Sequence, residues 1–330
     1  MSLAWSAALI LPAFAAWVAI AWLRGSRAAT VLSDVPNERS LHATVMPRVG
    51  GLGLLAGALP VAAWLGDAPI VVLVVCATVL AAISAADDRR SLPIAVRMPA
   101  HVAAAAVAIL AIASPDAARA GIGIVESALA LAAIVWMANL YNFMDGSDGL
   151  AGGMTLIGFG ALALAAALAR EWPLALACAA IASASAGFLA HNFPPARVFM
   201  GDAGSVPLGF LAGALGLHGA LAGAWTIALP IIVFSPFIAD ATVTLARRVV
   251  RGEPFWKAHR SHHYQRLVLS GWSPRRLALS AYALMLAAAG SAIAARGSDA
   301  QMQLAIIAGW TALYAVIFLA ISRRNPASAT

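Results

Sequence analysis

The sequence predicts an all-α, polytopic integral membrane protein. Two features of its composition carry that prediction: 62% of the 330 residues are hydrophobic, and only 11% are charged. A soluble domain carries about 25% charged residues, so this chain has too few to cover a surface that faces water. The apolar residues also come in long runs, as membrane-crossing helices require.

Eleven of these runs, at roughly 17 to 22 residues, are long enough to cross a hydrocarbon core of about 30 Å. Their many Ala and Gly residues favour close helix–helix contact in lipid. Nothing indicates a separate soluble domain, so we expect residues 1–330 to form one transmembrane domain. The predicted helices are 3–23, 49–66, 68–86, 98–114, 124–141, 150–169, 173–190, 205–223, 225–246, 277–295 and 301–321.

The basic residues predict the orientation of the chain. With eleven crossings, eighteen of the 21 Lys and Arg residues fall on one side, and only Arg119, Arg170 and Arg296 fall on the other. The positive-inside rule places the first side in the cytoplasm, with the N-terminus outside and the C-terminus inside. This bias explains the net charge of +7 without nucleic-acid binding. The predicted cytoplasmic loops are 24–48, 87–97, 142–149, 191–204 and 247–276.

Acidic and histidine residues follow the same asymmetry, so we expect one face to carry the active site. The first cluster on that face is Asp87 and Asp88, at the end of the third run. Adjacent like charges at a membrane boundary are unfavourable unless a bound cation or an Arg side chain compensates them. They indicate either a functional site or a solvated helix end paired with Arg89 and Arg90.

The second cluster is the stretch NLYNFMDGSDG, residues 139–149. Asn139, Asn142, Asp145 and Asp148 are spaced by three, so they would form a polar stripe if the stretch were helical. A polar loop with Asx–Gly turns is the alternative. That alternative does not explain two Asn residues within an apolar helix, where polar groups are functional candidates.

The third cluster, HNFPPARVFMGDAGSVPLGF, spans residues 191–210. Small residues and free N–H groups at a helix start form an anion site. A carboxylate beside it, Asp202, suggests a metal ion that bridges to phosphate oxygens. Alternatively, Asp202 or Ser205 only caps the helix.

The fourth cluster is the 247–276 loop, which mixes eight basic residues with aromatic ones and suits the lipid headgroup region. That reading does not explain His259, His262 and His263. Together the four clusters favour Mg²⁺-assisted phosphoryl chemistry at the inner leaflet.

Five motifs resemble, in order, those of the polyprenyl-phosphate N-acetylhexosamine-1-phosphate transferases: DVPNERSLHATVMPRVGG, DDRRSLPIAVR, NLYNFMDGSDGLAGG, FMGDAGSVPLGF and HRSHHYQRL. The resemblance covers about residues 34 to 270 and is greatest to the bacterial branch that starts O-antigen or related surface glycans. These enzymes transfer a sugar 1-phosphate from a UDP-sugar to a polyprenyl phosphate and release UMP. The resemblance implies an enzyme of the bacterial inner membrane that uses Mg²⁺ (or Mn²⁺), undecaprenyl phosphate and a UDP-N-acetylhexosamine. UDP-GlcNAc, UDP-GalNAc, UDP-FucNAc and UDP-QuiNAc are all compatible.

The resemblance also implies roles for individual residues. Asp87 and Asp88 would lie near the lipid phosphate, with one of them deprotonating the acceptor. Asp202 would bind Mg²⁺, with Asp88 as a second candidate ligand, and the Phe199 ring would stack on uracil. The implied substrate-binding residues are Arg48, Asn142, Asp145, Asp148, Asn192, Phe199, Gly201, His259, His262 and His263.

The chain departs from the family pattern at three places. Ser91 replaces a frequent Lys, Met46 replaces a polar residue, and the histidine motif ends His262-His263-Tyr264. The last difference argues against the phospho-N-acetylmuramoyl-pentapeptide transferase of peptidoglycan synthesis, which stays the first alternative. A secondary transporter is the next, although transporters place their sites near the bilayer midplane and often contain internal repeats. A non-catalytic scaffold is a further alternative, but it would not need these clusters. The sequence is also compatible with a homodimer.

Overall fold

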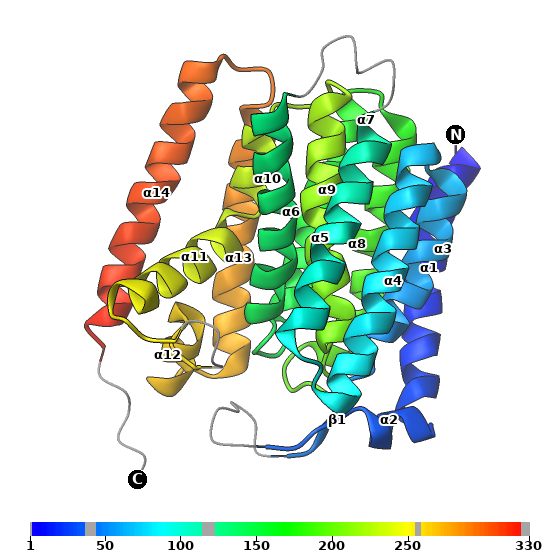
Figure 1. Ribbon diagram of the computed structural model, residues 1–330, viewed down its shortest axis with the longest axis vertical. Helices are drawn as coiled ribbons and strands as arrows, with labels where there is room; N and C mark the ends of the chain where they lie inside the picture. Colours follow the sequence, from blue (N-terminus) through cyan, green and yellow to red (C-terminus); the bar gives the residue numbers. More distant parts are fainter. Residues whose placement is uncertain (1, 37–43, 114–122, 255–258, 325–330) are drawn as a thin grey trace.

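The computed structural model describes residues 2–36, 44–113, 123–254 and 259–324, which form a bundle of helices (Figure 1). Nine helices within these residues are long and apolar enough to cross a membrane. The protein is therefore an all-helical, multi-pass membrane protein, as predicted. The nine are α1 (Ser2–Arg24), α4 (Ala68–Arg90), α5 (Ile94–Ile112), α6 (Ile124–Phe143), α7 (Leu150–Leu168), α8 (Trp172–Asn192), α9 (Asp202–Leu221), α13 (Pro274–Ala294) and α14 (Ala300–Ser322).

Two predicted spans differ from the prediction. The run 49–66 forms α3 (Gly50–Leu65), whose 16 residues make it shorter than the nine. The prediction of one helix over 225–246 is wrong, because this run divides into α10 (Ala228–Val233) and α11 (Ser235–Val250). Pro236 lies in the first turn of α11, where its missing N–H is tolerated, but it could not continue a preceding helix. In Figure 1, α11 runs obliquely to α13 and α14.

The helices at the centre of the bundle approach one another through small residues. Within an apolar stretch of 18 residues in each helix, 78% is buried in α8 and in α9, compared with 17% in α14. A Cβ atom at Gly51 of α3 would overlap Gly204 of α9, and one at Gly187 of α8 would overlap the Ala13 carbonyl of α1. Close backbone approach of this kind is typical of helix packing in membranes. Thus α8 and α9 form the centre, and α14 lies at the edge.

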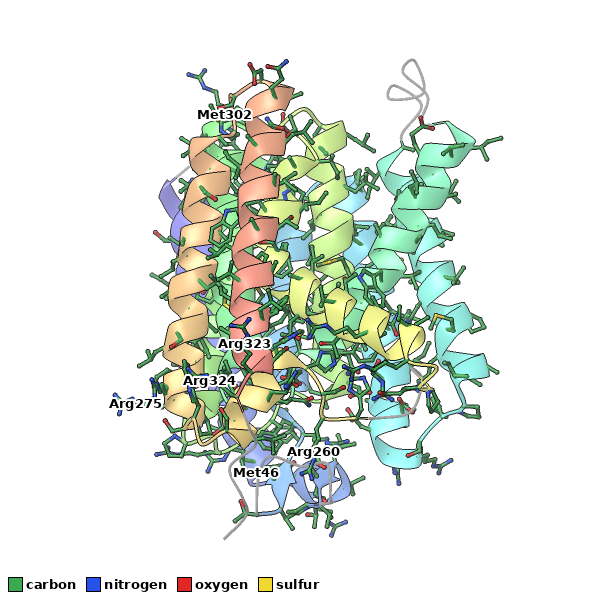
Figure 2. The ribbon with its side chains drawn as sticks, turned by 90° about the vertical axis from the view of Figure 1, so that its left-hand side faces the viewer. Met46, Arg260, Arg275, Met302, Arg323 and Arg324 are labelled. Atoms are coloured by element: carbon green, nitrogen blue, oxygen red, sulfur yellow. The ribbon has the colours of Figure 1, made fainter. Side chains whose placement is uncertain are left out.

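One end of the bundle carries the short elements and many of the basic side chains. In Figure 1, α2 (Arg27–Val31), the strand β1 (Ser33–Asp34) and α12 (His263–Leu269) lie at this end, whereas α1 begins at the opposite end. β1 pairs antiparallel with β2 (Met46–Pro47). Figure 2 shows Arg260, Arg275, Arg323 and Arg324 at this end and Met302 at the other. Residues 37–43 and 255–258, within the predicted loops 24–48 and 247–276, lie outside the described residues.

Candidate active site

The two adjacent acids at the end of α4 have separate surroundings. The Asp87 carboxylate is 2.7 Å from an Arg97 guanidinium nitrogen and accepts a hydrogen bond from the Leu92 N–H at 2.6 Å. Asp88 instead faces the beginning of α9, where it accepts a hydrogen bond from the Ala203 N–H at 3.2 Å. Only 1% of its side chain is exposed. Asp87 thus stabilises the turn from α4 to α5, and Asp88 points into the candidate site.

The N-terminus of α9 brings four of the predicted residues together. Gly201, just before the helix, has φ +73° and ψ 168°, a conformation that side chains with a Cβ avoid. Asn142 donates a hydrogen bond to Ser205 Oγ at 3.0 Å, and its amide also lies against the Asp202 carboxylate. Because Asp88 accepts from the first turn of α9, a carboxylate already occupies part of the anion site predicted there.

Arg48 is the cation of this site. Its guanidinium is 2.6 Å from Asp34 Oδ1 and 3.3 Å from Asp88 Oδ1. Burial alone would lower the pKa of Arg48, but these acids outweigh it and raise the pKa above its usual value. Arg48 therefore stays charged and links the β1–β2 pair to the end of α4.

Asp145 lies on the loop after α6 and completes the acidic group. Its carboxylate interacts with the Gly201 N–H. Burial raises the pKa of Asp145 well above its usual range, and the nearby Asp202 and Asp88 raise it further. Arg48 offsets only part of this effect. Three carboxylates therefore converge on one guanidinium, and the excess negative charge favours a bound cation.

Asp148 and Asn192 join two loops rather than extend the acidic group. Asp148 accepts a hydrogen bond from the Ala196 N–H at 2.9 Å. Asn192 accepts from the Gly149 N–H and donates to the Val198 carbonyl, both at 2.8 Å. These bonds fix the 142–149 loop against the segment that carries Phe199, whose side chain is half-buried.

The predicted histidines divide into two environments. His262 is buried and stacks on Phe143 and on His259, with ring centres 6.1 and 5.0 Å apart. It therefore adjoins the loop that carries Asp145. His263 points the other way, with its ring 3.8 Å from that of Phe318 and Nδ1 3.0 Å from Asp240. Burial, together with the nearby His262, lowers the pKa of His259 to about 4, so its ring is neutral at pH 7.

Asp240 of α11 holds the histidine segment in place. Its Oδ1 accepts hydrogen bonds from the backbone N–H and Nδ1 of His263, at 2.8 and 3.0 Å. Its Oδ2 accepts from the Tyr264 N–H at 3.0 Å, and Thr244 Oγ lies 3.1 Å from Oδ1. Tyr264 in turn donates its hydroxyl to the Phe143 carbonyl at 3.0 Å. This chain of bonds ties α11 and α12 to the end of α6.

The acidic group fits a Mg²⁺ ion only if substrate completes the coordination. Within the part of the chain that the structure describes, no group of three or more His, Cys, Asp or Glu residues is arranged to hold a metal. Mg²⁺ usually takes one or two carboxylates together with substrate phosphates and water. Asp202 and Asp88 can supply those carboxylates, from the first turn of α9 and the last turn of α4.

Comparison with known proteins identifies the family. The model of glycosyl transferase family 4 matches residues 70–220. The chain is 31% identical to a probable undecaprenyl-phosphate N-acetylglucosaminyl 1-phosphate transferase of Bacillus subtilis, over 83% of this chain and 80% of that protein. The chain belongs to glycosyl transferase family 4.

Two further relatives differ in the activity that their names give. A decaprenyl-phosphate N-acetylglucosaminephosphotransferase of Mycobacterium leprae is 28% identical, over 75% of this chain and 72% of that protein. A phospho-N-acetylmuramoyl-pentapeptide-transferase of Acaryochloris marina is also 28% identical, over 90% of this chain and 85% of that protein. The family inferred from the five motifs is confirmed.

The structure corrects one part of the sequence reading and adds residues that it missed. The condition for a polar stripe from Asn139 to Asp148, a helix over the whole stretch, is not met, because α6 ends at Phe143 and Asp145 and Asp148 lie on the loop of the alternative interpretation. Asn139 turns away from the site, toward the Val135 carbonyl and His101. The sequence assigned no role to Asp34 or Asp240. Asp34 is the first residue of the first family motif, DVPNERSLHATVMPRVGG. Its place in that motif is the signal from which a role could have been predicted.

Proposed function

We propose that this family 4 enzyme transfers N-acetylglucosamine 1-phosphate from UDP-N-acetylglucosamine to undecaprenyl phosphate and releases UMP. The observation that carries the proposal is the convergence of Asp88, Asp145 and Asp202 on Arg48 at the basic end of a membrane bundle. The activity named for the Bacillus subtilis relative favours this sugar and this lipid. The product would start a lipid-linked surface glycan such as O-antigen.

The proposed location is the cytoplasmic face of the bacterial inner membrane. Undecaprenyl phosphate cannot leave the bilayer, while the UDP-sugar is soluble, so the two meet at headgroup depth. We propose that α3 and the α10–α11 pair also cross, which gives eleven crossings with the N-terminus outside. The positive-inside rule and the Arg side chains gathered at one end support this orientation.

The proposed reaction exchanges one phosphorus–oxygen bond for another. An oxygen of the acceptor phosphate attacks the phosphorus that carries the sugar. The bond from that phosphorus to the bridging oxygen breaks, and UMP leaves with the bridging oxygen. Catalysis of such a transfer requires mainly positioning of the substrates and neutralisation of their charge.

Each part of the site has a proposed role in this transfer. Asp202, with Asp88 as a second ligand, would hold Mg²⁺, which neutralises phosphate charge when bound. Asp88, held by the Ala203 N–H and Arg48, also faces the acceptor phosphate, while Asp87 is held by Arg97 at the turn from α4 to α5. The proposed UDP-sugar-binding side chains lie on the loops joined by Asn192 and on the histidine segment, and they are Asn142, Asp145, Asp148, Phe199, His259 and His262. Residues 1–330 would act as one transferase domain.

The test is UMP release by the purified full-length chain with undecaprenyl phosphate and Mg²⁺. The donor panel is UDP-GlcNAc, UDP-GalNAc and UDP-N-acetylmuramoyl-pentapeptide. We expect turnover with UDP-GlcNAc and none with the pentapeptide donor. Turnover with the pentapeptide donor alone would assign to this chain the activity named for the Acaryochloris marina relative, and the absence of UMP with every donor would reject the transferase proposal.

A further inference from the structure

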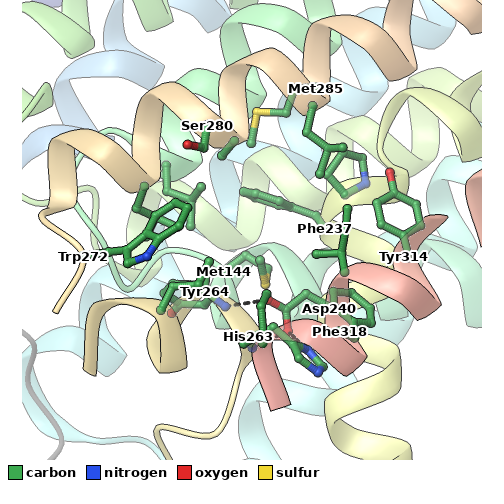
Figure 3. Close-up of a pocket in the computed structure, with 18 of the residues that line it drawn as sticks. Met144, Phe237, Asp240, His263, Tyr264, Trp272, Ser280, Met285, Tyr314 and Phe318 are labelled. Carbon is green, nitrogen blue, oxygen red and sulfur yellow. Dashed lines mark hydrogen bonds and ion pairs between the residues drawn. The ribbon is translucent and has the colours of Figure 1, made fainter. Parts of the chain in front are cut away.

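A cavity of about 340 Å³ lies among α11, α12, α13 and α14, next to the candidate site. Its lining is mainly apolar and includes Phe237, Met285 and Phe318, which Figure 3 shows around the space. The volume lies within the range of about 300 to 1,000 Å³ that is typical of ligand pockets. The cavity therefore has room for part of a hydrocarbon chain.

The rim of this cavity is aromatic and basic. Trp272 and Arg324 both line it. The Arg276 and Arg324 guanidinium carbons lie 4.2 and 5.5 Å from the centre of the same Trp272 ring. Both arginines are exposed, and neither takes part in an ion pair with another described residue. Each guanidinium is attracted by the indole, but the two positive charges repel each other, and an anion bound between them would relieve that repulsion.

We propose that the cavity binds an anionic glycerophospholipid, with one acyl chain among α11–α14 and its phosphate between Arg276 and Arg324. Trp and Arg side chains at headgroup depth suit this class of ligand, because the indole is amphipathic and guanidinium groups bind phosphate oxygens in pairs. Arg275 and Arg323, which lie near Arg324 in Figure 2, add to the positive field. This lipid would be a resident of the membrane and is neither substrate nor product.

The position of the rim separates this lipid from the acceptor of the reaction. Arg276 and Trp272 belong to α13 and the segment before it, and Arg324 follows α14. The three converging carboxylates belong instead to α4, the loop after α6, and α9. A phosphate held at the rim would therefore lie on elements that contribute none of the reacting groups.

Occupancy of the cavity would stabilise the segment that carries the histidines. Asp240, His263 and Tyr264 form one wall of the cavity (Figure 3), and Tyr264 is bonded to the end of α6. α14 adjoins this wall, because Phe318 stacks on His263 and packs with Tyr314 and Ile321. A lipid in the cavity would fill the space between this wall and the lining residues of α13, and would increase the thermal stability of the protein.

The test is native mass spectrometry of the detergent-purified full-length chain, titrated with dioleoyl-phosphatidylglycerol or dioleoyl-phosphatidylcholine. We expect one molecule of phosphatidylglycerol to bind roughly ten-fold or more tightly than phosphatidylcholine. The double variant Arg276→Ala/Arg324→Ala should lose this preference. The matched control Arg24→Ala/Arg27→Ala, which removes two exposed arginines at the same end, should keep it.

A cavity-filling variant tests the acyl-chain site separately. Ala281→Phe places a ring in the cavity and leaves both arginines unchanged, so it should lower phosphatidylglycerol binding as well. The proposal is overturned if the double arginine variant binds phosphatidylglycerol like the unmodified chain, or if the two lipids bind equally. Stoichiometric displacement of phosphatidylglycerol by undecaprenyl phosphate would also overturn it, because the cavity would then belong to the path of the acceptor.

Discussion

A single buried carboxylate, Asp240, and a group of three, Asp88, Asp145 and Asp202, lie near the same end of the bundle, and they differ in their hydrogen-bond donors. Asp240 is surrounded by donors from His263, Tyr264 and Thr244. Asp88, Asp145 and Asp202 instead accept hydrogen bonds from Ala203, Gly201 and Asn142, respectively. Their mutual repulsion is offset mainly by Arg48, with Arg97 also acting on Asp202. A buried carboxylate whose donors are all supplied by the protein stabilises the fold. A group of carboxylates with too little positive charge is completed by a ligand.

The largest effect is expected from removing a negative charge from the group formed by Asp88, Asp145 and Asp202. Asp202→Asn should lower the rate of UMP release by about 100-fold or more, because an interaction worth a few kcal/mol in the transition state is lost. Its melting temperature should stay close to that of the unmodified chain, since the lost charge was poorly compensated. Initial rates at saturating Mg²⁺ and thermal unfolding in detergent provide the two measurements.

Asp67→Asn is the matched control for that variant. Asp67 caps α4 by accepting a hydrogen bond from the Ile70 N–H, and Asn caps a helix equally well. Its turnover should therefore be unchanged. Near-normal turnover of Asp202→Asn would reject the proposed metal role and would leave Asp202 as a residue of the α9 N-terminus only.

Removing the Asp240 carboxylate should instead lower the stability of the protein. Asp240→Ala leaves the His263 and Tyr264 N–H groups without their acceptor, so it should destabilise the protein by about 2 to 4 kcal/mol. Turnover should fall as a consequence, because His262 loses its fixed position beside Phe143. Thermal unfolding compared with Asp202→Asn measures the difference. Equal stability of the two variants would remove the distinction drawn between Asp240 and the group of three.

A smaller effect is expected from exchanging the shared cation. Arg48→Lys keeps the charge, but one ammonium group cannot reproduce the two contacts to Asp34 and Asp88. We expect turnover to fall on the order of ten-fold. Arg97→Lys, where the guanidinium contacts Asp87 through one nitrogen, should have a weaker effect in the same assay. A larger loss from Arg97→Lys would show that turnover depends more on the ion pair of Asp87 than on that of Asp88.

The smallest effect concerns the stability of the acidic group itself. Because the folded-state pKa of Asp145 is raised, its charged form opposes folding at high pH. This effect disappears as the pH falls from above the raised pKa toward the unfolded value near 3.9. Asp145→Asn should therefore raise the melting temperature at pH 8, in the presence of a chelator, and raise it less at pH 5. Asp299→Asn, at the cap of α14, should show no such dependence on pH.

The sequence by itself determined the class of protein, the family and the candidate face. Apolar runs predict membrane helices because their length must match the bilayer. Basic residues predict the cytoplasmic face because Lys and Arg are enriched in cytoplasmic loops. The five motifs predicted the family because their order and spacing are specific. They also identified Asp88, Asp145, Asp202 and Arg48, which the structure brings together.

Only the tertiary structure decided which of these residues face one another. Asp87 and Asp88 are neighbours in the chain, but successive residues of a helix point in different directions, and the partners supplied by Arg97 and Ala203 separate them. Asp240 and His263 meet across 23 positions, and Asp88 meets Ala203 across 115. Local spacing contains no record of such pairs, because they depend on how α4, α9, α11 and α12 pack in three dimensions.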